Sequence, residues 1–214
     1  MITGCTYGVV LNDRGERTAL ATSFKSPPYK APPEAPVVYI KPRNCITVEG
    51  AAISAPEFAE TEVDALEVAA TIAVVFAHDL TKVDADAALA GIGAARLAID
   101  VCVPHASYYR PAIAERCRDG FLPLGESAGL PAGSIQITTF IDDVKAHSWS
   151  LDYLVRPIGQ LISDLSQFMT LCAGDALLVG LPGDAPQAGV GQTVRVEAEG
   201  FPTLTTRIES EARA

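Results

Sequence analysis

Residues 71–77 read TIAVVFA, and this nearly continuous apolar run indicates a strand that is buried on both faces. On either side of it, strand-like segments alternate with turns rich in Gly, Pro and Asp. The other segments expected to form strands are VVYIKP (37–42), SIQITTFIDD (134–143), HSWSLDY (147–153), DALLVGLP (175–182) and TVRVEAEGFPTLTTRIES (193–210). The pattern predicts a strand-rich α+β domain.

Two segments are predicted to be helices. DADAALAGIGAARLA (84–98) begins with Asp and spaces its large apolar residues roughly as a helix does, although two glycines weaken it. Residues 157–169 have a proline in the first turn and one apolar face, as an amphipathic helix does. The Gly-rich segment 180–191 lacks the Lys-Ser/Thr ending of a phosphate-binding loop, so we interpret it as a turn.

The N-terminal part is expected to differ from the rest. CTYGVVLND (5–13) followed by RGERTALAT (14–22) predicts a hairpin around an Asn-Asp-Arg-Gly turn. SPPYKAPPEAP (26–36) holds five prolines, so it is predicted to be a connector and not a helix or a central strand. We therefore divide the chain into an N-terminal hairpin with a Pro-rich connector (1–36) and a main domain (37–214).

Composition restricts the partners of the chain. Its 26 acidic and 16 basic residues give a formal net charge of −10, which argues against nucleic acid or an anionic membrane as the main partner. No apolar run reaches the roughly 20 residues of a membrane span, and the first residues lack the regions of a signal peptide. We expect a cytoplasmic protein that concentrates its cations wherever it binds an anionic substrate.

One stretch, DVCVPHASYYRPAIAERCRDG (100–120), concentrates reactive side chains. Its arginines, Arg110, Arg116 and Arg118, suit carboxylate ligands, but arginines of an acidic protein also form structural ion pairs. Asp100 follows an apolar step and fits two roles equally well, a metal-binding carboxylate or a turn residue.

The cysteines favour a structural interpretation. They are five in number and widely scattered, so we expect reduced, partly buried thiols and neither a zinc site nor a disulfide framework. A nucleophilic Cys102 or Cys117 would require His105 as its base. No Gly-x-Ser-x-Gly sequence supports a Ser-His-Asp triad.

Taken in order, six pieces of the chain resemble the fumarylacetoacetate hydrolase family. They are YIKP (39–42), ISAP (53–56), TIAVVFA (71–77), AIDVCVP (98–104), CRDGFLPLG (117–125) and FMTLCAGDALLVGLP (168–182). Within the family, YYRPAIAERCRDGFLPLGE is most similar to the N-terminal half of the isomerase/decarboxylases of 4-hydroxyphenylacetate degradation. The resemblance implies a mixed β-roll with peripheral helices, usually dimeric, and chemistry on small 2-keto or enol di- and tricarboxylates.

The resemblance also implies a divalent metal, Mg²⁺ or Mn²⁺, held by a Glu-x-Glu pair and an Asp. Asp100 matches the metal-binding Asp, but Ala69 and Thr71 stand where the Glu pair is expected. One carboxylate alone cannot hold Mg²⁺, which prefers near-octahedral oxygen coordination. Glu67 shares a strand face with Ala69 and Thr71, so it either reaches inward or lies exposed at the end of the strand.

Site residues follow from the same resemblance. Lys41 matches a common family residue, and its other interpretation is a strand-end lysine with a solvated tip. Arg116 keeps the cationic character of a lysine that the family has at this place. We expect Lys41, His105 and Asp100 to be catalytic, and Arg116 and Arg118 to bind substrate carboxylates.

Three functions stay open at this point. The chain is a subunit of an isomerase/decarboxylase that converts 5-oxopent-3-ene-1,2,5-tricarboxylate to 2-hydroxyhepta-2,4-dienedioate and isomerises the product. Alternatively it is a non-catalytic partner, as a homodimer or with a homologous metal-binding subunit. The third function, a diverged hydrolase, is weakened because Pro104 and Ser107 replace an Arg and a Gln that contact ligand in the family's hydrolases.

Overall fold

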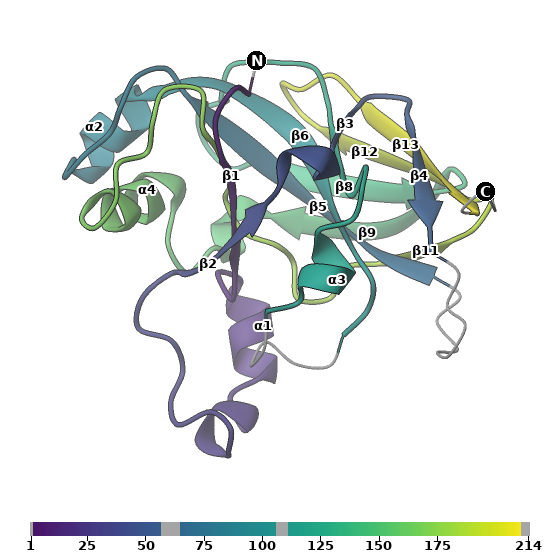
Figure 1. Ribbon diagram of the computed structural model, residues 1–214, viewed down its shortest axis with the longest axis horizontal. Coiled ribbons are helices and arrows are strands. Elements are labelled where there is room, and N and C mark those ends of the chain that lie inside the picture. Colours follow the sequence, from purple (N-terminus) through teal and green to yellow (C-terminus); the bar gives the residue numbers. More distant parts are fainter. Residues whose placement is uncertain (1, 57–64, 106–110, 211–214) are drawn as a thin grey trace.

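The computed structural model describes residues 2–56, 65–105 and 111–210, whose strands form two sheets (Figure 1). The larger sheet contains β1 (Thr6–Val10), β2 (Val37–Lys41), β3 (Ile46–Val48), β5 (Ala65–Phe76), β6 (Ile92–Cys102), β7 (Leu122–Leu124), β10 (Ala176–Leu178) and β11 (Gln187–Gly189). Its strand order is β2-β1-β10-β5-β6-β7-β3, and β11 pairs with the first part of β5.

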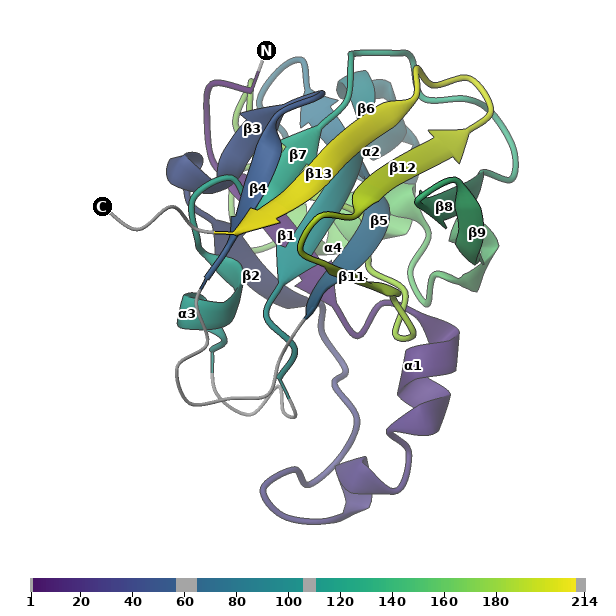
Figure 2. The same cartoon turned by 90° about the vertical axis from the view of Figure 1, so that its right-hand side faces the viewer.

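The smaller sheet has five strands in the order β4-β13-β12-β8-β9. They are β4 (Ala52–Ala55), β8 (Gln136–Ile141), β9 (Val144–Ser150), β12 (Thr193–Ala198) and β13 (Leu204–Ser210). Figure 2 shows β12 and β13 lying across one face of β5 and β6. The main core, which contains buried residues of both sheets, fills the space between them.

Helices occupy the periphery. They are α1 (Arg14–Ala19), α2 (Ala85–Ala90), α3 (Ile113–Arg116) and α4 (Ile158–Ser166), with 3₁₀ turns η1 (Ser23–Lys25), η2 (Arg43–Cys45) and η3 (Leu151–Tyr153). In Figure 1, α2 and α4 lie together at one end, while α1 and η1 project from the body. The strand-rich α+β architecture with peripheral helices is therefore confirmed. Among the described helices, none has the length and apolar character needed to cross a membrane.

Strand β5 contains the run 71–77 and explains its apolar sequence. Because side chains alternate along a strand, its even-numbered residues from Leu66 to Phe76 point into the core between the two sheets. On the opposite face, Ala69 packs near β1 and Ala73 packs near β7 and β10. The prediction of a strand buried on both faces is confirmed.

The helix predicted over 84–98 is largely wrong. Asp84 does cap a helix, since its Oδ1 accepts a hydrogen bond from the backbone N–H of Ala87 at 2.8 Å, but that helix, α2, ends at Ala90. The chain then becomes β6, which pairs antiparallel with β5 along nearly its whole length. Pairing in the sheet satisfies a backbone whose two glycines give little helical preference. Asp100 consequently lies inside a strand and not in a turn.

The predicted N-terminal hairpin is also wrong. Strand β1 is followed by helix α1, whose cap is Asp13, and β1 lies in the sheet between β2 and β10. The Pro-rich segment 26–36 contains no helix or strand, as predicted, and leads back to β2. The helix expected over 157–169 is confirmed as α4. The Gly-rich segment 180–191, predicted to be a turn, includes the short strand β11.

Candidate functional site

Asp100 is the centre of a buried polar cluster. Its Oδ1 lies 3.1 Å from Lys41 Nζ and 3.1 Å from an Arg116 guanidinium nitrogen, and its Oδ2 accepts a hydrogen bond from the Tyr39 hydroxyl. We call Tyr39, Lys41, Asp100 and Arg116 the Asp100 cluster. The carboxylate is fully buried and carries a cation or a donor on each oxygen, so its charge is neutralised inside the protein.

Two strands that are not neighbours supply this cluster. Tyr39 and Lys41 are two residues apart on β2, so both point to the same side of the strand. Strand β2 is separated from β6 by β1, β10 and β5 in the sheet order, yet both side chains reach Asp100. The larger sheet must therefore curl, as the β-roll implied by the family resemblance requires, but the contact of these two side chains with Asp100 could not be read from the sequence.

Lys41 is held by the backbone around it. Its ammonium group donates hydrogen bonds to the carbonyl oxygens of Val101, Arg116 and Phe121 at 3.0, 2.6 and 2.9 Å. Because a lysine has three N–H donors, these bonds occupy all of them. Lys41 is 1% exposed, so the interpretation as a strand-end lysine with a solvated tip is wrong. Its role in proton transfer stays a prediction.

The two arginines predicted to bind substrate differ in position. Arg116, at the end of α3, is buried, pairs with Asp100 and lies over the Tyr39 ring at 5.4 Å from its centroid. Arg118 is partly exposed, and its Nε donates to the carbonyl oxygen of Ala114 at 2.8 Å. The structure thus brings Arg116, but not Arg118, into the Asp100 cluster. Arg110 and Ser107 lie outside the described residues.

His105 and Cys102 lie where β6 ends. His105 is half-buried and comes three residues after Cys102, the last residue of the strand. Burial raises the pKa of the Cys102 thiol to about 12, an effect that the Arg116 charge only partly opposes. Burial likewise raises the pKa of Cys45 to about 11. Since the nucleophile is the thiolate, these values argue against the nucleophilic role considered for Cys102.

Glu67 turns out to be partly buried. It lies opposite Cys102 in the β5–β6 pairing, two residues before Ala69 on the same face of β5. Burial raises the pKa of its carboxyl above the usual range, Arg116 lowers it, and Asp100 raises it further. Within the described part of the chain its carboxyl accepts no hydrogen bond. The inward alternative for Glu67 is therefore the better description.

The described residues do not fit Mg²⁺ or Mn²⁺. Ala69 lies directly opposite Asp100 and offers no ligand, and the Thr71 hydroxyl donates to the carbonyl oxygen of Gly180 at 2.5 Å. Both oxygens of Asp100 are already engaged. Over residues 2–56, 65–105 and 111–210, no three His, Cys, Asp or Glu side chains are grouped as metal ligands. The hard oxygen donors that these ions require are missing here.

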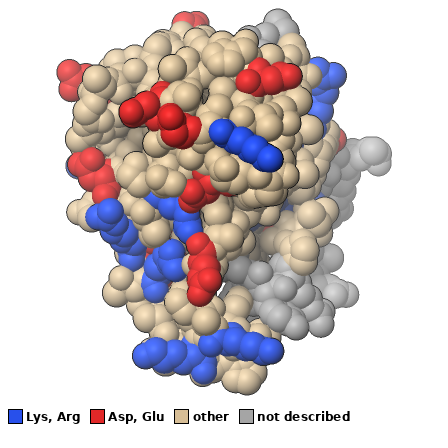
Figure 3. Space-filling model, turned by 90° about the vertical axis from the view of Figure 1, so that its left-hand side faces the viewer, with Lys and Arg blue, Asp and Glu red and all other residues tan. Residues whose placement is uncertain are grey.

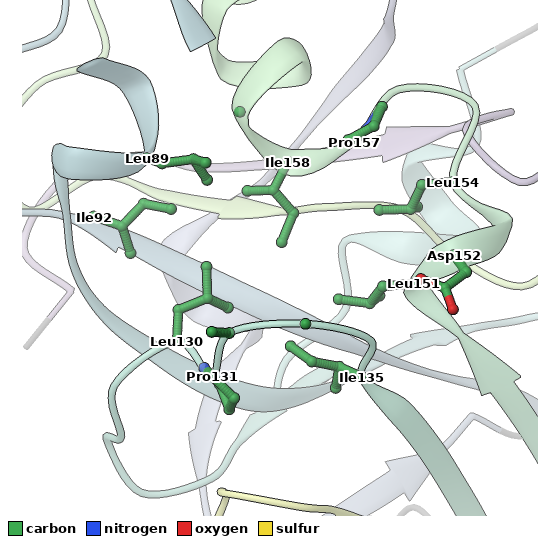
Figure 4. A pocket seen from close by; sticks show the side chains of 13 residues that line it. Leu89, Ile92, Leu130, Pro131, Ile135, Leu151, Asp152, Leu154, Pro157 and Ile158 are labelled. Carbon is green, nitrogen blue, oxygen red and sulfur yellow. The ribbon is translucent and has the colours of Figure 1, made fainter. Parts of the chain in front are cut away.

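Two pockets lie away from this cluster. One, of about 520 Å³, is lined by apolar residues of α2, the loop 130–135 and the start of α4, with Asp152 at its edge (Figure 4). The other, of about 420 Å³, lies between α1, β9 and residues 183–184. Neither pocket contains a residue of the Asp100 cluster.

Tyr39 was missed by sequence reasoning, although a signal existed. It alternates with Lys41 on a strand whose lysine was already a candidate, so the tyrosine had to share its face. Nothing in the sequence indicated that this face would meet β6. The hydrogen bond from the Tyr39 hydroxyl to Asp100 depends on the curl of the larger sheet.

The curated isomerase/decarboxylases that match this chain cover it almost completely, but the chain covers only about half of each of them. The 4-hydroxyphenylacetate degradation bifunctional isomerase/decarboxylase of Escherichia coli is 39% identical over 209 residues, which are 97% of this chain and 48% of that protein. The chain spans about half the length of the curated isomerase/decarboxylases that it matches. The mitochondrial oxaloacetate tautomerase FAHD2 of Oryza sativa subsp. japonica is 26% identical over 196 residues, covering 85% of this chain and 84% of the relative.

Solved structures share the fold. The 5-carboxymethyl-2-hydroxymuconate delta-isomerase of Mycobacterium smegmatis matches with a TM-score of 0.80 at 22% identity, covering 99% of this chain and 78% of the other. Fumarylpyruvate hydrolase of Pseudomonas aeruginosa, solved with Mn²⁺ and pyruvate, has a TM-score of 0.79 at 16% identity, covering 97% and 90%. The family profile described as fumarylacetoacetate (FAA) hydrolase C-terminal matches residues 5–209. The chain therefore belongs to the fumarylacetoacetate hydrolase family.

Proposed function

We propose that this chain is one half of an isomerase/decarboxylase of 4-hydroxyphenylacetate catabolism in the cytoplasm. The whole enzyme would decarboxylate 5-oxopent-3-ene-1,2,5-tricarboxylate to 2-hydroxyhepta-2,4-dienedioate and then isomerise that product. The observation that carries the proposal is the 39% identity to the E. coli isomerase/decarboxylase along 97% of this chain. Because that relative is about twice as long, a second, homologous half is part of the proposal.

The Asp100 cluster supports a division of labour between the two halves. Its carboxylate is neutralised by Lys41 and Arg116, and the described residues offer no further ligands for a metal. Metal-dependent steps are therefore assigned to the second half. This chain supplies the fold that completes the enzyme. Arg116 and Arg118 are the side chains proposed to bind substrate carboxylates.

A second candidate function is metal-independent isomerisation by this chain alone. Moving a double bond requires a group that takes and returns a proton. Glu67 favours this candidate, because its carboxyl has a raised pKa and lies beside the Arg116 charge. His105, half-buried at the end of β6, is the other described side chain that suits proton transfer.

One experiment tests the proposal. The purified chain is incubated with the tricarboxylate alone, with a homologous chain that carries the Glu-x-Glu pair, and with Mg²⁺ or EDTA in each case. Release of CO₂ and the absorbance of the dienoate are followed, and size-exclusion chromatography with light scattering reports whether the two chains associate. Fumarylpyruvate serves as a hydrolase substrate for comparison.

We expect decarboxylation only in the mixture with Mg²⁺, together with a complex larger than either chain. Isomerisation of added 2-hydroxyhepta-2,4-dienedioate by the chain alone in EDTA would favour the second candidate function. Hydrolysis of fumarylpyruvate without any decarboxylation, or no turnover and no association in any mixture, would overturn the proposal.

A further inference from the structure

The surroundings of Asp100 oppose the binding of a divalent ion. A divalent ion bound to Asp100 Oδ1 would have to approach an oxygen that already lies 3.1 Å from Lys41 Nζ and 3.1 Å from an Arg116 nitrogen, and an ion bound to Oδ2 would have to displace the Tyr39 hydroxyl. The ion would carry two positive charges into contact with two others in a buried place, where charge repulsion is strong. Asp100 is therefore closed to a metal by charge, and the described residues offer no further ligands beside it.

Arg116 is fixed in this position by its backbone as well as by its side chain. Its carbonyl oxygen accepts a hydrogen bond from Lys41 Nζ at 2.6 Å, and the Cys45 thiol lies 3.9 Å from the same oxygen. Its guanidinium group contacts Asp100 and the Tyr39 ring. A small rotation of the Arg116 side chain would not free the Asp100 carboxylate. Lys41 contacts this carboxylate and also donates a hydrogen bond to the carbonyl oxygen of Arg116 in α3.

The opposite strand shows where further ligands would stand. Ala69 lies directly opposite Asp100 in the β5–β6 pairing, and Thr71 follows two residues later on the same face. Both are completely buried. Glutamates at these two places would face the same side of the sheet as Asp100 and would need a cation to remain buried and ionised.

We propose that two cations of the protein take the place of a divalent metal at this site. Arg116 and Lys41 supply the positive charge at Asp100, so the chain binds no divalent metal there. Substitutions at three positions can test this replacement. Introducing carboxylates at positions 69 and 71 while removing the Arg116 guanidinium would leave three carboxylates beside one cation, Lys41, so the altered site is expected to attract a divalent ion. This inference deepens the division of labour proposed above and rests on it, but its tests measure ion binding and not turnover, so the two proposals can fail separately.

The first test uses the chain as it exists, after treatment with EDTA. Binding of Mn²⁺ is measured by electron paramagnetic resonance and calorimetry, and thermal unfolding is recorded with and without the ion. We expect no stoichiometric Mn²⁺ and no shift of the melting temperature. Tight stoichiometric Mn²⁺ that is lost in Asp100→Asn would overturn the proposal, and this measurement requires no redesigned protein.

The second test compares two triple variants that are matched in size. Ala69→Glu/Thr71→Glu/Arg116→Met restores the carboxylates, and Ala69→Gln/Thr71→Gln/Arg116→Met keeps the same volumes without the charges. We expect the Glu variant to bind Mn²⁺ at least a hundredfold more tightly than the Gln variant and to melt at a higher temperature when the ion is added, because binding to the folded state stabilises it. If the Glu variant folds but binds Mn²⁺ no more tightly than the Gln variant, the proposal that protein cations take the place of a metal here is wrong.

Discussion

At the residue scale, Asp100 shows how a buried charge is tolerated. The carboxylate has no access to water, and Lys41, Arg116 and Tyr39 replace the water it has lost. A buried ion pair adds little to stability relative to apolar side chains, but loss of one partner leaves the others uncompensated. The cluster therefore makes the fold sensitive to single substitutions within it.

Asp100→Asn is expected to lower the free energy of unfolding by about 3–5 kcal/mol, because it leaves two buried cations without their carboxylate. Urea unfolding followed by the fluorescence of the single tryptophan, Trp149, measures this change. Asp184→Asn is the control, since Asp184 forms an ion pair with His147 but its side chain is 84% exposed. Equal effects of the two substitutions would contradict the assignment of Asp100 as the centre of the cluster.

Glu67 gives a pH dependence whose sign can be worked out. Burial raises its pKa in the folded protein above the unfolded value of 4.5. Between the unfolded and the folded pKa the native state binds more protons, so the free energy of unfolding falls as pH rises. Stability from this group is fully present below pH 4.5 and is lost as pH passes the raised folded value.

Glu67→Gln is therefore expected to stabilise the protein at neutral pH and to flatten this decline. The free energy of unfolding of both proteins is measured with urea between about pH 4 and 8, because the decline begins near the unfolded pKa of the glutamate. Parallel curves with the same slope would contradict a raised pKa for Glu67.

At the element scale, helix α1 is joined to the second sheet through its cap. Asp13 Oδ1 accepts a hydrogen bond from the backbone N–H of Glu16 at 2.7 Å, and its Oδ2 accepts one from the indole N–H of Trp149 on β9 at 2.9 Å. Asp13, which was expected in a hairpin turn, thus caps α1 and also accepts a hydrogen bond from β9.

Asp13→Ala is expected to cost about 1–2 kcal/mol for the lost cap, and more for the buried indole N–H that it leaves without a partner. Asp84→Ala is a matched control, because Asp84 caps α2 through one exposed hydrogen bond to Ala87. The comparison uses unfolding free energies together with the emission maximum of Trp149. A shifted emission maximum in Asp84→Ala and none in Asp13→Ala would contradict the described contact.

At the scale of the whole molecule, the charges are unevenly placed. The chain carries a net charge of −10, but its projecting N-terminal segment holds Arg14, Arg17, Lys25 and Lys30. Figure 3 shows basic side chains at the lower end of this face, where that segment lies, and mixed charges above. Cations are thus concentrated locally, in this segment and in the Asp100 cluster, where they pair with a carboxylate of the protein itself.

The family assignment and the strand-rich architecture could be predicted because they depend on local patterns. The continuous apolar run at 71–77, the apolar strand at 37–42 and the helical period after Pro157 are each visible in adjacent residues. The prediction of a helix over 84–98 was wrong because β6 pairs with β5 along nearly its whole length. These backbone hydrogen bonds outweigh a weak helical preference.

By itself, the sequence determined which residues are present, and through the family resemblance it predicts that Ala69 and Thr71 stand where a Glu pair is expected, that Asp100 matches a metal-binding Asp and that Arg116 keeps a positive charge. Only the tertiary structure decided what these residues do together. The curl of the larger sheet brings Tyr39 and Lys41 of β2 to Asp100 of β6, and α3 adds Arg116. A buried carboxylate must find a counter-charge, and which one it finds depends on contacts between segments far apart in the chain.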